Sequence, residues 1–144
     1  MSLLAKDDIS SAPESSLHAL ILVVERNPAV QRLERFFLEQ AGYTVEFAID
    51  GEAALERARK LKPKILVSEI LVPKLDGLQL CRTLKAHPET AHIIVMIFSH
   101  LQAEDRALEA GADAFLSKPL DEEMLLDTLQ RLLALRRSAG GDQI

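Results

Sequence analysis

Several residue types are scarce in this chain, and each shortage excludes a class of protein. Among 144 residues there is one cysteine, Cys81, so no disulfide can form within the chain, which fits a reducing cytoplasm. Cys81 falls among apolar helix positions and is expected to be a small buried hydrophobe. The longest apolar runs, residues 19–24 and 93–98, have six residues each, against the ~18 that cross a bilayer. We therefore expect a cytoplasmic protein without membrane insertion.

Positive charge and aromatic rings are in short supply as well. Lys and Arg number 17 against 22 Asp and Glu, which gives a net charge of −5. So acidic a chain lacks the basic surface of a nucleic-acid binder, and no direct nucleic-acid binding is expected. Aromatic residues make up 4% of the chain, so little is available to stack on a base or a flavin. The segment ERNPAV also lacks the glycines of a dinucleotide-binding loop.

The length and the local composition predict one domain with short tails. A chain of 144 residues is close to the ~150 of a single domain. Residues 1–18 hold five serines and a proline without helical or strand periodicity, and they are interpreted as a flexible tail. The domain is expected over residues 19–137, and residues 138–144 are interpreted as a flexible tail or the start of a linker.

Short apolar or β-branched runs predict five strands, at residues 20–24, 44–48, 65–68, 93–98 and 114–116. Runs without polar alternation are typical of strands buried on both faces of a parallel sheet. The stretches between them carry apolar residues three and four apart, as helices do. This alternation predicts an α/β fold with a doubly wound parallel sheet, because right-handed crossovers place helices over both of its faces.

The expected helices have recognisable starts and ends. Asn27 is predicted to cap the first helix, with Pro28 at its first position, and Asp50, Asp76 and Asp121 to cap three others. Gly42 and Gly111 are predicted to end two helices, and the last helix to end near Arg137. The residues predicted to face inward are Val30, Leu33 and Phe37 in the first helix and Met124, Leu125, Thr128, Leu129 and Leu132 in the last.

Three segments carry a resemblance to a known family. They are ILVVERNP at the first strand, SEILVPKLDG after the third, with Pro73 and Asp76-Gly77, and EAGADAFLSKP at the fifth. Over roughly residues 19–135 the chain resembles the receiver domain of bacterial two-component response regulators. The resemblance implies a flavodoxin-like (βα)5 sandwich whose parallel sheet has the strand order 2-1-3-4-5. It also favours a cis peptide bond between Lys118 and Pro119.

The resemblance assigns roles to residues at the strand ends. In that family, two acids after the first strand and an aspartate after the third hold Mg²⁺, and the aspartate accepts a phosphoryl group from a histidine kinase. Here Glu25 matches the first acidic position, Arg26 the second, and Glu69 the phosphoacceptor position. Ser99 and Lys118 match the hydroxyl and the lysine that contact the phosphoryl oxygens.

Two departures from the family pattern bear on phosphoryl transfer. Arg26 puts a cation where Mg²⁺ needs an oxygen ligand, and like charges ~4 Å apart repel by about 4 kcal/mol at an effective dielectric constant of about 20. We expect Mg²⁺ binding to be lost or weak, and no other metal or cofactor to bind. Glu69 is longer than aspartate, and a misplacement of about 1 Å can cost ~10²-fold in rate. We expect Arg26 to take the place of the metal ion and reach Glu69, with Lys118 as a second cation.

The output side of the fold is also predicted to be unusual. Ser99 and Lys118 are 118 − 99 = 19 residues apart, about one helical turn less than the family pattern, so the fourth helix or the loop before it should be short. Phe115 stands at the switch position, where tyrosine is common, and should keep one buried rotamer. Partners are expected on the face made by the fourth helix, the fifth strand and the fifth helix, which could also form a homodimer.

Three functions are compatible with these observations. The leading hypothesis is a degenerate receiver, or pseudo-receiver, of a bacterial phosphorelay that is not an enzyme and binds a histidine kinase or an output protein. The alternative is a receiver still phosphorylated at Glu69 or a neighbour, and the third is a flavodoxin-like cofactor binder. Purely structural interpretations also stand: Glu25 and Arg26 as a solvated pair, Ser99 as a strand-end hydroxyl, Phe115 as core, and His87, His92 and His100 as surface residues.

Overall fold

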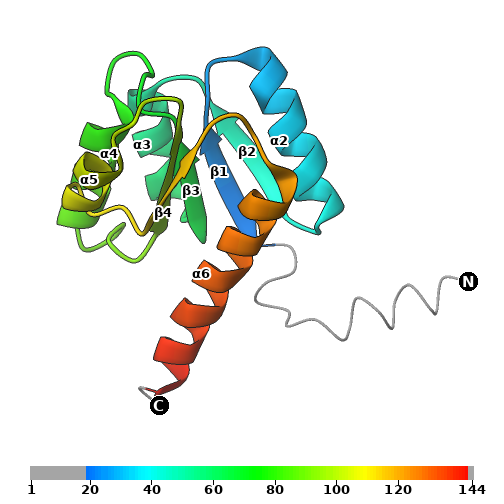
Figure 1. Cartoon of the computed structure of the whole chain (residues 1–144). Coiled ribbons are helices and arrows are strands. Elements are labelled where there is room, and N and C mark those ends of the chain that lie inside the picture. Colours follow the sequence, from blue (N-terminus) through cyan, green and yellow to red (C-terminus); the bar gives the residue numbers. More distant parts are fainter. Residues whose placement is uncertain (1–18, 143–144) are drawn as a thin grey trace, which may run out of the picture.

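A computed structural model describes residues 19–142 and shows a central sheet between two layers of helices (Figure 1). The five strands are parallel and follow the order β2-β1-β3-β4-β5, which confirms the predicted topology. Their bounds are β1 Leu20–Val24, β2 Thr44–Ala48, β3 Ile65–Ser68, β4 Ile94–Ser99 and β5 Ala114–Ser117. The predicted N-terminal tail, residues 1–18, lies outside the described residues, as do the last two residues.

Within residues 19–142, five helices cover the sheet: α2 Pro28–Gln40, α3 Gly51–Leu61, α4 Gly77–Ala86, α5 Glu104–Glu109 and α6 Glu122–Asp142. α2 and α6 close one face, where Leu38 and Leu125 join one apolar cluster. α3, α4 and α5 close the other, where Leu80 and Ala107 join a second cluster. Cys81 is fully buried in that second cluster, as expected, and burial raises the pKa of its thiol to about 11.

The helices begin and end largely where local sequence chemistry predicts. Asn27 Oδ1 accepts a hydrogen bond from Ala29 N at 2.9 Å, with Pro28 in the first turn. The aspartates before α3, α4 and α6 cap these helices in the same way, with oxygen-to-nitrogen distances of 2.8, 2.9 and 3.0 Å. Gly42 and Gly111 have φ angles of 98° and 99°, the left-handed region expected where they end helices.

The strand register brings the polar strand ends together. Val24 pairs with Ser68 between β1 and β3, and Ser99 pairs with Ser117 between β4 and β5. Because the strands are parallel, the residues that follow them lie at one edge of the sheet, where ligands bind in doubly wound folds. This edge is where the sequence predicts the functional residues.

The last two helices have unequal lengths. α5 has six residues, which confirms the predicted short fourth helix. α6 continues to Asp142, five residues past the predicted end near Arg137 (142 − 137 = 5). Two glycines suggested a tail there, but each costs a helix only about 1 kcal/mol, which does not end a helix that leucine and arginine favour. Within residues 19–142, no helix is both long and apolar enough to cross a membrane.

The inward stripe of α6 is largely as predicted. Leu125, Thr128 and Leu129 are buried, and Leu132 packs partly buried against the same cluster. Met124 is 52% exposed, so its predicted inward position is wrong. Successive residues are turned by about 100° around a helix, so Met124 lies to the side of the buried stripe that begins at Leu125.

The buried face of α2 differs from the predicted stripe. Val30 and Phe37 are partly buried, but Leu33 is 48% exposed, so its predicted inward position is wrong. Glu34 and Leu38, four residues apart and hence on one side of the helix, are the buried residues instead. Apolar residues are frequent enough along α2 to fit more than one face, and packing on the sheet decides between them.

Candidate functional site

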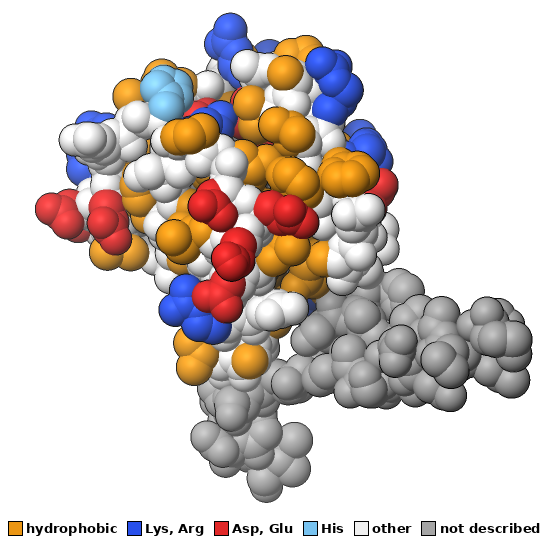
Figure 2. All heavy atoms as spheres, turned by 45° about the vertical axis from the view of Figure 1, so that its right-hand side comes forward, with side chains coloured by type: hydrophobic (Ala, Val, Ile, Leu, Met, Phe, Trp, Pro, Cys, Tyr) orange, Lys and Arg blue, Asp and Glu red, His pale blue; other side chains and the backbone are white. Residues whose placement is uncertain are grey.

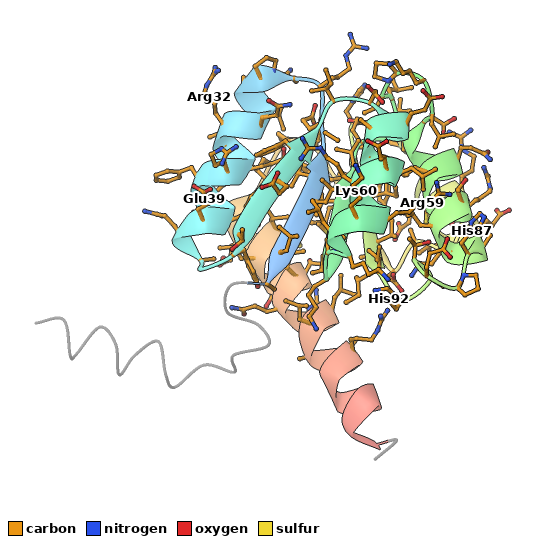
Figure 3. All side chains as sticks on the ribbon, turned by 180° about the vertical axis from the view of Figure 1, so that it is seen from behind. Arg32, Glu39, Arg59, Lys60, His87 and His92 are labelled. Carbon is orange, nitrogen blue, oxygen red and sulfur yellow. The ribbon has the colours of Figure 1, made fainter. Side chains whose placement is uncertain are left out.

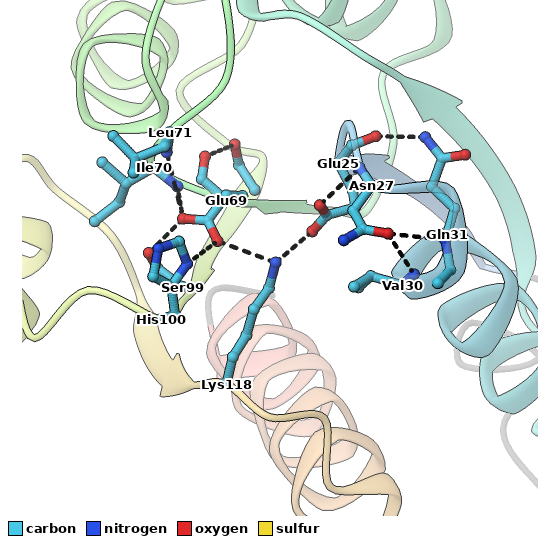
Figure 4. A network of polar contacts seen from close by, with 12 residues as sticks. Glu25, Asn27, Val30, Gln31, Glu69, Ile70, Leu71, Ser99, His100 and Lys118 are labelled. Atoms are coloured by element: carbon cyan, nitrogen blue, oxygen red, sulfur yellow. Dashed lines mark hydrogen bonds and ion pairs between the residues drawn. The ribbon is translucent and has the colours of Figure 1, made fainter.

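Side chains from four strand ends form a polar pocket of about 350 Å³ at one edge of the sheet. The pocket is lined by Glu25, Arg26, Asn27, Val30, Glu69, Leu71, His100 and Lys118. Lys118 reaches between the two acids, with its Nζ atom 2.7 Å from Glu25 Oε1 and 3.0 Å from Glu69 Oε1 (Figure 4). One ammonium group thus joins the ends of β1, β3 and β5.

Both carboxylate oxygens of Glu69 accept contacts. Oε2 accepts hydrogen bonds from the Ser99 hydroxyl and from the backbone N–H groups of the next two residues, the latter at 2.6 and 3.3 Å. Oε1 accepts a hydrogen bond from Lys118 and lies 3.3 Å from His100 Nδ1 (Figure 4). Because the side chain is only 3% exposed, these protein groups take the place of water around the carboxylate.

Glu25 is held by groups from the start of α2. Its Oε2 atom accepts a hydrogen bond from Asn27 N at 3.1 Å, and the Gln31 side-chain amide donates to the Glu25 backbone carbonyl. The side chain of Glu25 is 3% exposed and its other oxygen contacts Lys118. Asn27 therefore serves two purposes, because its side chain caps α2 and its backbone N–H orients an acid of the pocket.

Asp76-Gly77 brings α4 close to the backbone at the acceptor position. Gly77 N donates to Ile70 O at 2.9 Å. A Cβ atom at Gly77 would lie 2.3 Å from Glu69 O, which no side chain could tolerate without a shift of the backbone. The glycine is thus required by close packing behind Glu69, which gives a physical reason for this part of the motif.

Burial and pairing act in opposite directions on the titration of the network. Burial raises the pKa of Glu69, but hydrogen bonds from Ser99 and Lys118 and the Lys118 charge outweigh it and hold the pKa below its usual value. Burial lowers the pKa of Lys118, but Glu25 and Glu69 outweigh it and the pKa is raised. At neutral pH the network therefore contains a charged Lys118 and an ionised Glu69.

Arg26 does not take the place of a metal ion, contrary to the prediction. It is exposed, and among the side chains described for residues 19–136 it forms no ion pair. Successive side chains on an extended strand end point to opposite sides, so Glu25 is directed at Lys118 while Arg26 stays exposed where it lines the pocket. Lys118, the predicted second cation, pairs with both acids instead.

Ser99 and Lys118 lie where the resemblance places them. Ser99 is fully buried, donates to Glu69 and accepts a hydrogen bond from Leu101 N at 3.1 Å. The Lys118–Pro119 peptide bond is cis, as the resemblance favours. These two residues tie the loops that follow β4 and β5 to the acid that follows β3.

Phe115 lies apart from the pocket, on β5. It is partly buried against the apolar cluster beneath α3, α4 and α5. It also lines a shallow surface hollow together with Glu104 and Ser117. Its single rotamer and its role as a switch stay predictions.

His100 is a contributor that sequence reasoning missed. Its side chain is 60% exposed, which agrees with the predicted surface position, yet the ring contacts Glu69. Its place directly after Ser99, at the end of a strand that leads to the site, is the signal that could have found it. Gln31 was missed as well, one helical turn after the cap of α2.

The residues present do not fit the Mg²⁺ ion that the resemblance implies. The carboxylates that would ligate it, Glu25 and Glu69, are both bonded to Lys118, and the third position is Arg26. Within the described part of the chain, no group of three or more His, Cys, Asp or Glu side chains is arranged to hold a metal ion. A divalent cation would have to displace an ammonium group from two buried acids.

Comparison with known proteins decides the family. Residues 21–130 match the model of the response regulator receiver domain. The chain belongs to this receiver family. It is 41% identical over 114 residues to the response regulator MprA of Mycobacterium ulcerans, covering 78% of this chain and 49% of MprA. It is 35% identical over 116 residues to the DNA-binding dual master transcriptional regulator RpaA of Synechocystis, covering 78% and 48%. This receiver chain spans about half the length of these relatives.

Solved receiver structures share the fold. The receiver domain of a signal transduction histidine kinase from Syntrophus aciditrophicus is 34% identical, with a TM-score of 0.75 and coverage of 81% of this chain and 90% of that one. The receiver domain of the sensor histidine kinase PA1611 from Pseudomonas aeruginosa, solved with a magnesium ion in its active site cleft, is 28% identical, with a TM-score of 0.75 and coverage of 81% and 98%. These matches do not favour a flavodoxin-like cofactor binder.

Proposed function

We propose that this receiver signals through protein–protein contacts without Mg²⁺-dependent phosphorylation, as a binding module and not as an enzyme. One observation carries the proposal: the Lys118 ammonium lies between the carboxylates of Glu25 and Glu69. In the family pattern these positions serve the metal ion, and here the two acids are already neutralised in part by a side chain of the protein itself.

The chemistry of Glu69 supports the proposal. An acceptor oxygen must be free to attack the phosphorus atom in line with the leaving group, and a divalent cation must neutralise the charge that develops. Both oxygens of Glu69 already accept contacts, including those from Ser99 and Lys118. These are the groups that the resemblance assigns to the phosphoryl oxygens, so Glu69 engages them without phosphate.

The proposed partners are a histidine kinase or an output protein, bound by the face of α5, β5 and α6, with a second copy as the alternative occupant. α5 is short, and the side chains of β5 are only partly buried. Figure 2 shows acidic side chains gathered over α6, where a shallow hollow is lined by Asp121, Glu123, Met124 and Asp127. An acidic surface of this kind repels the phosphates of nucleic acid.

Incubation with a small acyl phosphate and Mg²⁺ tests the proposal by mass spectrometry of the intact chain. We expect no gain of a phosphoryl group, whereas a receiver with an aspartate at the acceptor position, treated in parallel, should gain one. A phosphorylated wild-type chain would overturn the proposal and favour Glu69 or a neighbour as an atypical acceptor.

The double variant Arg26→Asp with Glu69→Asp asks how far the site departs from the family. It restores three acids with Glu25 while Ser99 and Lys118 stay in place. We expect the double variant to bind Mg²⁺ in a calorimetric titration, and each single variant to bind weakly or not at all, because residues that share one site are strongly non-additive. A double variant that binds no Mg²⁺ would contradict this account of the site.

A further inference from the structure

A third buried acid lies outside the pocket, in the interior between α2 and the sheet. Glu34 is 1% exposed, and its Oε1 atom has no hydrogen-bond partner. Among the side chains described for residues 19–136, one other buried side-chain atom lacks a partner, Thr128 Oγ1 of α6. α2 and α6 pack against each other over the same face of the sheet (Figure 1).

Apolar residues flank Glu34 along the buried side of α2. Leu38 lies one turn further along α2 on the same side, and Val30 one turn before it, and both belong to the cluster that Leu125 and Leu129 of α6 complete. The charged residues Arg32 and Glu39 lie instead on the outer side of α2 (Figure 3). Glu34 is therefore an acid at a position where an apolar side chain would be expected.

We propose that Glu34 is a buried proton-binding group that makes the packing of α2 against the sheet and α6 depend on pH: the neutral acid fits this interior, and the carboxylate does not. A neutral carboxyl group can be buried at moderate cost, whereas an ionised one without a partner cannot. The proposal stands independently of whether the receiver is phosphorylated.

The charges around Glu34 support a titration in the accessible range. Burial raises the pKa of Glu34 to about 8; the negative charges of Glu25 and Glu69 add to this, and Lys118 opposes it. These three groups lie at the ends of β1, β3 and β5. The polar residue on the buried side of α6 is the uncharged Thr128. The charged residues Asp127 and Arg131 of α6 are exposed and pair with each other at 3.4 Å.

Ionisation of Glu34 would also change the electrostatic interactions in the pocket. Glu25 and Glu69 already share one ammonium group. A third carboxylate nearby adds repulsion between the acids and a competing attraction for Lys118. We therefore expect rising pH to loosen α2 and to redistribute Lys118 among the acids.

Infrared spectroscopy of the wild-type chain in deuterated buffer tests the proposal without relying on a variant. From about pH 6 to about pH 10, two units on either side of the pKa, we expect the stretching band of one protonated carboxyl group to disappear with a midpoint near the pKa. Glu34→Gln should lack this band, whereas Glu39→Gln, which changes an exposed acid of the same helix, should keep it. A band absent at the acidic end, or one that persists in Glu34→Gln, would overturn the proposal.

A second measurement covers the case in which Glu34→Gln folds poorly. Hydrogen exchange of the α2 amides should speed up in the wild type as pH rises through the same range, after correction for the intrinsic rate. Glu34→Leu, whose side chain suits the apolar surroundings, should show no such acceleration. Equal acceleration in Glu34→Leu and the wild type would contradict the proposal.

Discussion

Two buried glutamates, Glu69 at the strand ends and Glu34 in α2, have pKa values shifted in opposite directions. Both are nearly inaccessible to water, at 4% and 1% exposure. Burial raises the pKa of each, yet Ser99 and Lys118 hold that of Glu69 below its usual value, whereas that of Glu34 rises to about 8. The comparison teaches that burial alone does not decide the charge of an acid, because its hydrogen-bond donors can outweigh it.

The difference follows from where each residue lies in the fold. Glu69 comes directly after β3, where the backbone N–H groups of the next two residues are available and neighbouring strands deliver a hydroxyl and an ammonium. Glu34 lies in the middle of α2, where each backbone N–H already bonds to the carbonyl four residues earlier. The sheet edge supplies donors to an acid, and the helix interior supplies none.

Of these two glutamates, Glu69 is the one whose removal should lower stability. In Glu69→Ala, the Ser99 hydroxyl, two backbone N–H groups and part of the Lys118 ammonium lose their acceptor. We expect the free energy of unfolding to fall by about 3 kcal/mol, the low end for breaking a buried pair, because Glu25 still pairs with Lys118. Chemical denaturation at neutral pH measures this. Glu39→Ala on the exposed side of α2 is the control, with an expected change below about 1 kcal/mol.

Replacement of Glu34 by leucine should instead stabilise the domain. Glu34→Leu removes a buried oxygen without a partner and places an apolar side chain beside Leu38 and Leu125. We expect a gain of about 1–3 kcal/mol at neutral pH, the cost of an unsatisfied buried polar group. The same denaturation assay measures it, and a loss of stability would mean that Glu34 has a partner in solution.

The two acids should make stability depend on pH in different ranges, Glu69 below pH 4.5 and Glu34 between pH 4.5 and about 8. The pKa of Glu69 is lower in the folded state, so its contribution is complete above the unfolded value of 4.5 and is lost as pH falls through the folded pKa. The pKa of Glu34 is higher in the folded state, so its contribution is complete below 4.5 and is lost as pH rises to about 8. In Glu69→Gln the loss of stability below pH 4.5 should flatten, while the decline between pH 4.5 and about 8 persists. Unfolding measured across pH resolves both slopes; a flattened slope between pH 4.5 and about 8 in this variant would contradict the assignment.

Much of the fold is readable from local sequence chemistry. Residues 20–24, 44–48 and 65–68 are predicted as strands with the observed bounds, because short apolar or β-branched runs of this length are typical of buried strands. The capping residues Asn27 and Asp76 act within one turn of themselves, so their role needs no knowledge of the rest of the fold.

Two features could not be predicted from local sequence: which residues of α2 face the sheet, and which cation pairs with the two acids of the pocket. Whether Glu34 or Leu33 faces the sheet depends on how the whole helix packs, because apolar residues occur on several sides of it. Whether Arg26 or Lys118 reaches the two acids depends on side-chain direction at two strand ends that are distant in the sequence. Both questions concern three-dimensional contacts, about which residue spacing carries no information.

Removal of Arg26 should have the smallest effect, although sequence reasoning gives it the central role. Arg26 is exposed and, among the described side chains, pairs with no acid, so Arg26→Ala should change the free energy of unfolding by no more than about 0.5 kcal/mol. Lys118→Met is the matched comparison, because it also removes one positive charge from the pocket lining. That variant leaves two buried carboxylates without their shared cation and should cost about 3–5 kcal/mol. If chemical denaturation finds equal losses for the two variants, Arg26 enters the pocket in solution and Lys118 does not hold the two acids alone.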